Sequence, residues 1–130
     1  MSTKHGEIHW SELMTRDTAA AKAYFEKIAG WTVDEMPMGD EEPPYLVCSA
    51  NGAPVAGIMD MNAPEFDGMQ PNWTTFIHVD DVDKACAQTE ADGGTIVRPP
   101  FDVAMAGRIA VVADPTGGIV ALITPNPEEA

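Results

Sequence analysis

Residues 73–94 read WTTFIHVDDVDKACAQTEADGG, and this stretch decides the fold. In its first half the side chains alternate between two faces, which predicts a strand. In its second half, Asp81 is placed to accept hydrogen bonds from the first free amides of a helix. Gly93 or Gly94 can then adopt the left-handed conformation that ends a helix. The stretch therefore predicts a strand followed by a helix.

The same layout occurs once before, between Trp10 and Gly30, at a constant offset of 64 residues (74 − 10 = 64). The positions that match at this offset include Trp10 with Thr74, Asp17 with Asp81, Gly30 with Gly94, Gly57 with Ala121 and Ile58 with Leu122. No gap is needed, and few of the matched residues are identical. The repeat therefore lies in the pattern of elements and predicts two similar units in tandem.

The remaining segments complete each unit with three more strands. A first strand is expected over residues 8–14, and further strands over 31–36, 45–50, 54–61, 95–98, 108–113 and 119–124. Asn51-Gly52 predicts a hairpin, since both turn positions require positive φ. Each unit then reads strand, helix, strand, strand, strand.

This order predicts an α+β fold. Because a unit of about 60 residues would be marginal alone, we expect two tandem βαβββ units that form a curved, mostly antiparallel sheet around a cleft, with one helix per unit packed outside. The first unit is expected over about residues 7–61, a linker over 62–72 and the second unit over about 73–124. Together they make one domain over residues 1–130.

Several segments carry narrower expectations. The first helix is expected to bury one stripe, made of Ala21, Tyr24, Phe25 and Ile28. Pro99-Pro100 is expected to break the strand before it. Residues 1–6 and 125–130 are expected to be loose tails, and residues 37–44 a mobile acidic loop.

Composition narrows the class of partner. The net charge is −14, from 21 acidic and 7 basic residues, which argues against nucleic acid. Such acidity favours solubility or salt adaptation, or else attracts cationic ligands. The sequence has no run of 18 apolar residues to span a membrane, and residues 1–7 lack the apolar core of a signal peptide. Cys48 and Cys86 have no paired spacing, so we expect a cytoplasmic protein with reduced cysteines.

Short motifs accompany the paired layout. They are Trp10–Asp17 followed by Tyr24-Phe25 and Gly30-Trp31, Val79–Asp83 with Gly93-Gly94, Gly107-Arg108, and Asp114-Pro115 with Gly117. With these motifs, about residues 7–124 resemble the vicinal oxygen chelate superfamily. That group holds glyoxalase I, extradiol dioxygenases, fosfomycin-resistance enzymes and bleomycin-resistance proteins. The resemblance implies a small-molecule ligand in the cleft and a homodimer.

The resemblance also implies where a metal would lie. In metal-dependent members, the first and last strands of each unit supply a His or Glu to one ion. The corresponding positions here are Trp10, Gly57, Thr74 and Ala121. None of them is a ligand type, since metal sites need His, Cys or carboxylate donors. We therefore expect no divalent metal cofactor and expect Trp10 to fill the vacated space.

Two titratable residues are candidates for chemistry. Strand alternation places Glu12 and His78 on the face that carries the expected cleft. They could form an acid–base pair, act as displaced metal ligands, or only satisfy each other. Asp60 would join them if a bulge turned it inward.

The expected ligand-binding cleft is lined by Trp10, Met14, Gly57, Met59, Thr74, Phe76, Arg108 and Ala121. Methionine and aromatic side chains suit adaptable apolar pockets, although each could also be ordinary core. Arg108 could pair with an anionic ligand group or form a surface salt bridge.

Three functions are compatible with these patterns. The first is a metal-free small-molecule binding protein of the resistance or sequestration type. The second is an enzyme of the lyase, dioxygenase or isomerase type that uses Glu12 and His78. The third is a structural or regulatory module whose cleft is filled by side chains.

Overall fold

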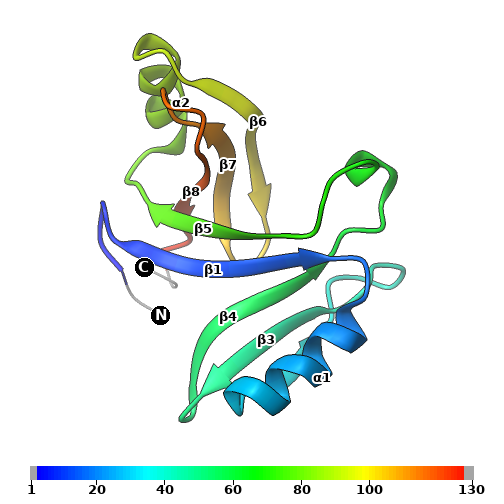
Figure 1. Cartoon of the computed structure of the whole chain (residues 1–130). Helices are drawn as coiled ribbons and strands as arrows, with labels where there is room; N and C mark the ends of the chain where they lie inside the picture. The colour runs from blue at the N-terminus through cyan, green and yellow to red at the C-terminus, as the bar shows by residue number, and fades with distance from the viewer. Residues whose placement is uncertain (1–2, 128–130) are drawn as a thin grey trace. The chain divides into compact units, whose positions relative to one another are not determined.

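The computed structural model describes residues 3–127, which form two compact units. The N-terminal unit is Trp10–Trp73, and the C-terminal unit holds the residues up to His9 together with those from Thr74 onward. The elements in chain order are β1 (Ile8–Thr15), α1 (Thr18–Ala29), β2 (Thr32–Met36), β3 (Tyr45–Ala50), β4 (Ala53–Asp60), the 3-10 helix η1 (Pro64–Phe66), β5 (Asn72–His78), α2 (Val82–Ala91), β6 (Thr95–Val103), β7 (Gly107–Ala113) and β8 (Ile119–Pro125) (Figure 1). Across residues 3–127, no helix has the length and apolar character needed to cross a membrane.

The strand register confirms the 64-residue repeat. In the N-terminal unit the order is β2-β3-β4-β1, and in the C-terminal unit it is β6-β7-β8-β5. β1 pairs in parallel with β4, with Glu12 opposite Gly57, and β5 pairs in parallel with β8, with Phe76 opposite Ala121. Both residue numbers of the second pair are 64 higher than those of the first (76 − 12 = 64 and 121 − 57 = 64). The other pairs within each unit are antiparallel, so the predicted α+β fold with two βαβββ units is confirmed.

The predicted helix ends are also confirmed. The side chains of Asp17 and Asp81 each accept a hydrogen bond from the backbone amide three residues on, at 3.0 and 3.1 Å. These bonds satisfy one free amide in the first turn of α1 and of α2. Gly30 ends α1 with φ of 68°, and Gly93 follows α2 with φ of 91°, a conformation that favours glycine.

Each helix covers one face of the sheet in its own unit. Beneath α1 lies a buried cluster of Leu13, Leu46, Cys48, Ala56 and Ile58. Beneath α2 lies a cluster of Val79, Val82, Cys86, Ala110, Val112 and Leu122. Because side chains alternate along a strand, the neighbours of these residues point to the opposite face. That opposite face of the N-terminal unit carries the candidate site.

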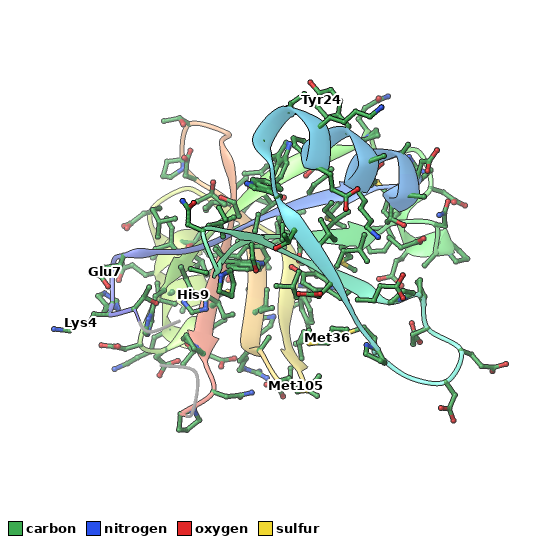
Figure 2. All side chains as sticks on the ribbon, turned by 90° about the horizontal axis from the view of Figure 1, so that it is seen from below. Lys4, Glu7, His9, Tyr24, Met36 and Met105 are labelled. Carbon is green, nitrogen blue, oxygen red and sulfur yellow. The ribbon has the colours of Figure 1, made fainter. Side chains whose placement is uncertain are left out.

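The stripe predicted for α1 is only half right. Ala21 and Phe25 pack against the core, whereas Tyr24 is 56% exposed and Ile28 is 60% exposed. Figure 2 shows Tyr24 on the outer side of the helix. Residues four apart lie on one line along a helix, and Tyr24 and Ile28 form a second line rotated away from Ala21 and Phe25. The contact of α1 with its sheet is therefore narrow and leaves the second line exposed.

The prediction that Pro99-Pro100 breaks its strand is wrong. β6 continues through both prolines to Val103, with a shift in register between Arg98 and Phe101. β6 lies at the end of the strand order in its unit, beside β7 alone. A proline lacks the amide hydrogen that an inner strand would need, but an edge strand tolerates this loss.

The prediction of a loose tail over residues 1–6 is wrong for the part that the structure describes. The Gly6 amide donates to the His78 carbonyl at 2.7 Å, and the His78 amide donates to the Glu7 carbonyl at 2.9 Å. Thr3 Oγ1 lies 2.6 Å from Nδ1 of His9 and 2.9 Å from Nδ1 of His78. These bonds explain why the residues up to His9 group with the C-terminal unit.

Other segments agree in part with expectation. The segment 62–72 holds η1, and the Arg16 guanidinium donates to the carbonyls of Phe66 and Met69 at 2.7 and 2.8 Å. Pro125 belongs to β8, so the predicted C-terminal tail begins later than expected. The last part of that tail, residues 128–130, lies outside the described residues.

Candidate functional site

Three hydrogen-bonded side chains lie on the N-terminal unit, on the sheet face away from α1. Trp10 Nε1 donates to the Tyr45 hydroxyl at 2.8 Å, and that hydroxyl donates to Glu12 Oε1 at 2.8 Å. β1 supplies Trp10 and Glu12, which are two residues apart and so share a face, while β3 supplies Tyr45. We call these three residues the Trp–Tyr–Glu array.

Gly57 makes room for the array. A Cβ atom at this position would lie 1.7 Å from the Tyr45 hydroxyl oxygen and 2.2 Å from its ring carbon Cζ. The tyrosine therefore occupies the space that any other residue at position 57 would need. Trp10 lies beside this space and donates a hydrogen bond to Tyr45. The expectation that Trp10 fills the space vacated by the metal ligands stays a prediction.

Burial controls the ionisation of the array. Glu12 is 9% exposed, and its burial raises the pKa of the carboxyl from 4.5 to about 6, although the hydrogen bond from Tyr45 acts in the opposite direction. Burial, followed by the nearby Glu12 carboxylate, raises the pKa of the Tyr45 phenol. Tyr45 therefore keeps its proton and remains a donor, and Glu12 is the member of the array that titrates near neutral pH.

His78 belongs to the C-terminal unit, where it is 6% exposed. Its ring meets that of His9 edge-on, with centroids 6.1 Å apart, and both rings share Thr3 as a hydrogen-bond partner. Glu12 and His78 each have a partner inside their own unit, namely Tyr45 and Thr3. An acid–base pair of Glu12 with His78 stays a prediction.

Asp60 is held in a local turn. Its carboxylate accepts hydrogen bonds from the backbone amide of Asn62 at 2.8 Å and from the side chain of Asn62 at 3.1 Å. β1 and β4 keep an unbroken register up to the pair of Thr15 and Asp60. The bulge that would turn Asp60 inward is therefore absent from the described strand β4 at this point.

The other predicted cleft residues divide between the two units. Met14 and Met59 are half-buried and opposite each other in the parallel pair of β1 and β4 in the N-terminal unit. Thr74, Phe76 and Ala121 belong to the C-terminal unit, where Phe76 and Ala121 are buried. The residues that the structure brings together are thus Trp10, Glu12 and Gly57, with Tyr45 added. The ligand-binding role of each stays a prediction.

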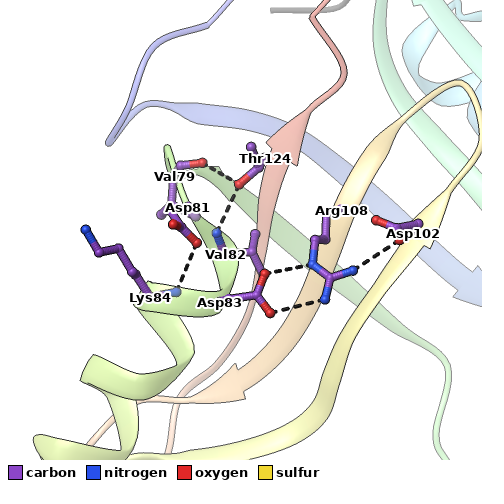
Figure 3. A network of polar contacts seen from close by, with 8 residues as sticks. All are labelled: Val79, Asp81, Val82, Asp83, Lys84, Asp102, Arg108 and Thr124. Carbon is purple, nitrogen blue, oxygen red and sulfur yellow. Dashed lines mark hydrogen bonds and ion pairs between the residues drawn. The ribbon is translucent and has the colours of Figure 1, made fainter.

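Arg108 forms a salt bridge, which was the alternative to a ligand contact. Its Nε and Nη2 donate to the two carboxylate oxygens of Asp83 at 2.8 and 3.1 Å, and Nη1 donates to Asp102 at 3.1 Å (Figure 3). Asp83 lies in the first turn of α2. Arg108 alternates with Ala110 and Val112, which pack beneath α2, so it points to the helix side. Its expected place among the cleft residues is corrected accordingly.

The residues at the four expected metal positions do not fit a metal ion. In the N-terminal unit, the indole of Trp10 offers only an N–H, already donated to Tyr45, and Gly57 has no side chain. In the C-terminal unit, Thr74 offers only a hydroxyl, and Ala121 offers no donor atom. Within residues 3–127, no group of three or more His, Cys, Asp or Glu side chains is arranged to hold an ion.

Comparison with known proteins supplies the family. A family model described as the Glyoxalase/Bleomycin resistance protein/Dioxygenase superfamily matches residues 7–122. The putative glyoxylase CFP32 of Mycobacterium tuberculosis (strain CDC 1551 / Oshkosh) is 37% identical over 123 residues, which are 95% of this chain and 47% of that protein. The anthracycline biosynthesis protein DnrV of Streptomyces peucetius is 30% identical over 131 residues, with 90% of this chain and 46% of that protein covered. The chain thus spans about half the length of the curated relatives it matches.

Solved structures show the same fold. A variant of methylmalonyl-CoA epimerase from Streptomyces coelicolor, in complex with 2-nitronate-propionyl-CoA, has a TM-score of 0.67 and 14% sequence identity. The match covers 95% of this chain and 97% of that one. At this identity the similarity concerns the fold alone.

Proposed function

Because the chain belongs to the glyoxalase/bleomycin resistance protein/dioxygenase superfamily, we propose that it binds a small organic molecule through the Trp–Tyr–Glu array, without a metal ion. The observation that carries this proposal is the Tyr45 hydroxyl in the space above Gly57. At the position where a metal-dependent member would supply a ligand, Gly57 has no side chain and Tyr45 keeps its proton, while the array presents fixed polar groups on an aromatic surface. Binding of the resistance or sequestration type needs no more than this.

The surroundings of the array suit a small organic ligand. Trp10 and Tyr45 are half-buried, and the flexible side chains of Met14 and Met59 share their sheet face. Ligand sites typically combine apolar and aromatic side chains with a few fixed polar groups, and methionine adapts to irregular shapes. The name of one relative supports the same ligand class, since it concerns anthracycline biosynthesis.

A thermal-shift screen of chelator-treated protein tests this proposal. A ligand present at 100 times its Kd should add about 2.7 kcal/mol to the free energy of unfolding. Tyr45→Phe removes both hydrogen bonds of the array and should abolish most of the shift. Arg108→Ala, altered on the α2 side of the C-terminal unit, should keep it. Stabilisation that appears only after a metal is added back would contradict metal-free binding.

The pKa of Glu12 favours a second candidate function, an enzyme. A carboxyl with a pKa of about 6 can give or take a proton near neutral pH. Glu12 would then act as the acid or base in a lyase, dioxygenase or isomerase. Incubation with methylmalonyl-CoA in D2O, followed by mass spectrometry, tests proton exchange of the isomerase type. Deuterium uptake that Glu12→Gln abolishes would favour the enzyme over the binding protein.

We also propose that the protein is a homodimer. Tyr24, Ile28 and Trp73 of the N-terminal unit are exposed, and apolar side chains that gather on a surface often mark an interface. Light scattering should give about twice the chain mass of 13.9 kDa. Ile28→Glu should shift the mass towards that of one chain, whereas Glu26→Gln on the same helix should not. A single-chain mass for the unaltered protein at high concentration would contradict the dimer.

A further inference from the structure

We propose that the group recognised at the Trp–Tyr–Glu array is a hydrogen-bond donor, and preferably a cationic amine carried on an aromatic or aliphatic body. This inference rests on the proposed function and specifies its ligand class. It follows from which hydrogen-bonding capacities the array uses internally and which it leaves for a ligand.

Both donors of the array are already used. The Trp10 indole has a single N–H, which it donates to Tyr45, and the Tyr45 phenol has a single O–H, which it donates to Glu12 Oε1. What remains are acceptors, namely the second carboxylate oxygen of Glu12 and the remaining lone pair of the Tyr45 oxygen. A ligand that bonds to the array must therefore supply the hydrogen.

The side chains next to the array on this sheet face add no donor. These neighbours are Met14 on β1, Val47 on β3, Gly57 and Met59 on β4, and Met36 on β2 opposite Tyr45. The hydroxyl side chains of this face, Ser49 on β3 and Thr32 on β2, lie four residues farther along their strands from Tyr45 and Met36. A thioether sulfur is at best a weak acceptor, and valine and glycine have no polar side-chain atoms. A carboxylate or phosphate placed against the array would meet acceptors and apolar groups, with no adjacent side-chain donor to satisfy it.

Charge and ring geometry favour an amine over a neutral donor. The N-terminal unit carries 11 of the 21 acidic residues of the chain and only 3 of its 7 basic residues. Such an excess of negative charge raises the local concentration of cations and repels anions, over the short distances at which dissolved salt does not screen the charge. Trp10 and Tyr45 also present aromatic faces, which attract a cation that lies against them. The buried Glu12 carboxylate supplies the matching charge.

NMR titration with three matched probes tests the inference. Phenethylamine, 2-phenylethanol and 3-phenylpropionate share an aromatic ring and a short chain but end in an ammonium, a hydroxyl and a carboxylate. The indole N–H of Trp10, identified by its loss in Trp10→Phe, reports on the array directly. Phenethylamine should shift this signal with a Kd at least tenfold lower than that of the alcohol, and the carboxylate should leave it unmoved.

Two variants separate a local contact from the general acidity of the chain. Glu12→Gln and Asp67→Asn each remove one negative charge from the N-terminal unit, and Asp67 is exposed and distinct from the array. Glu12→Gln should raise the Kd for phenethylamine at least tenfold, and Asp67→Asn should leave this Kd almost unchanged. Equal losses in the two variants, or preference for the alcohol or the carboxylate, would overturn the inference. A Trp10 signal that none of the three probes shifts would contradict the proposed function itself.

Discussion

Gly57→Ala is expected to destabilise the protein by about 1–3 kcal/mol, the usual cost of overfilling a packed site. The new methyl group would lie 1.7 Å from the Tyr45 hydroxyl oxygen, 2.2 Å from Cζ and 2.7 Å from Cε2. The tyrosine ring is rigid, so it must swing away and lose its hydrogen bonds to Trp10 and Glu12. Denaturant unfolding of both proteins measures the loss.

A double-mutant cycle shows whether Tyr45 is the cause. In a Tyr45→Ala background the space above Gly57 is empty, so Gly57→Ala should cost much less than it does alone. If Gly57→Ala costs the same in both backgrounds, something other than Tyr45 requires the glycine, and the account of the array is wrong.

Glu12→Gln is expected to change how stability depends on pH. The native carboxyl has a pKa raised from 4.5 to about 6, so between these values the native state holds a proton that the unfolded chain has released. The free energy of unfolding therefore falls as pH rises from about 4.5 to about 6, by about 2 kcal/mol in total. Above that range, the effect of Glu12 on the free energy of unfolding no longer changes with pH. A glutamine cannot ionise. The free energy of unfolding of Glu12→Gln, measured relative to that of the unaltered protein, should therefore rise by about 2 kcal/mol from pH 4 to pH 7.

Urea unfolding at the two pH values checks this expectation. Asp67→Asn serves as the control, because it removes an exposed carboxylate from the same unit. A difference between Glu12→Gln and the unaltered protein that is constant with pH would contradict a raised pKa for Glu12. If the variant instead became more stable relative to the unaltered protein as the pH fell, the pKa of Glu12 would be lowered by folding and not raised.

The repeat of the two units was predictable because helix ends and strand alternation are visible in the local sequence pattern. Asp17 and Asp81 cap helices through bonds to amides only three residues away, so sequence alone places them. The constant offset of 64 residues then fixes equivalent registers, such as Glu12 opposite Gly57 and Phe76 opposite Ala121. These features need no knowledge of tertiary contacts.

Tyr45 was missed because a bulge decides which face it occupies. Near the Asn51-Gly52 turn, Ala50 pairs with Ala53, but the register shifts by one between Cys48 and Ser49. Without that shift, Tyr45 would lie opposite Ile58 on the α1 side, since a slip of one residue exchanges the faces. The one signal in the sequence was Gly57, whose missing side chain leaves room for a large neighbour.

The run of Pro99-Pro100 was misjudged for a different reason. Whether a proline ends a strand depends on whether the strand has one neighbour or two. That depends on the position of β6 in the sheet, and strand order is a tertiary property. The exposure of Tyr24 and Ile28 on α1 likewise depends on how much of the helix meets the sheet.

We propose that Tyr45 and Gly57 replace a metal site with a hydrogen-bonded array. Elemental analysis of protein purified without a His-tag, repeated after incubation with zinc, nickel, iron or manganese, tests it most directly. No stoichiometric ion is expected under any of these conditions. One ion per chain, lost in Glu12→Gln or His78→Ala, would contradict it and would favour the enzyme.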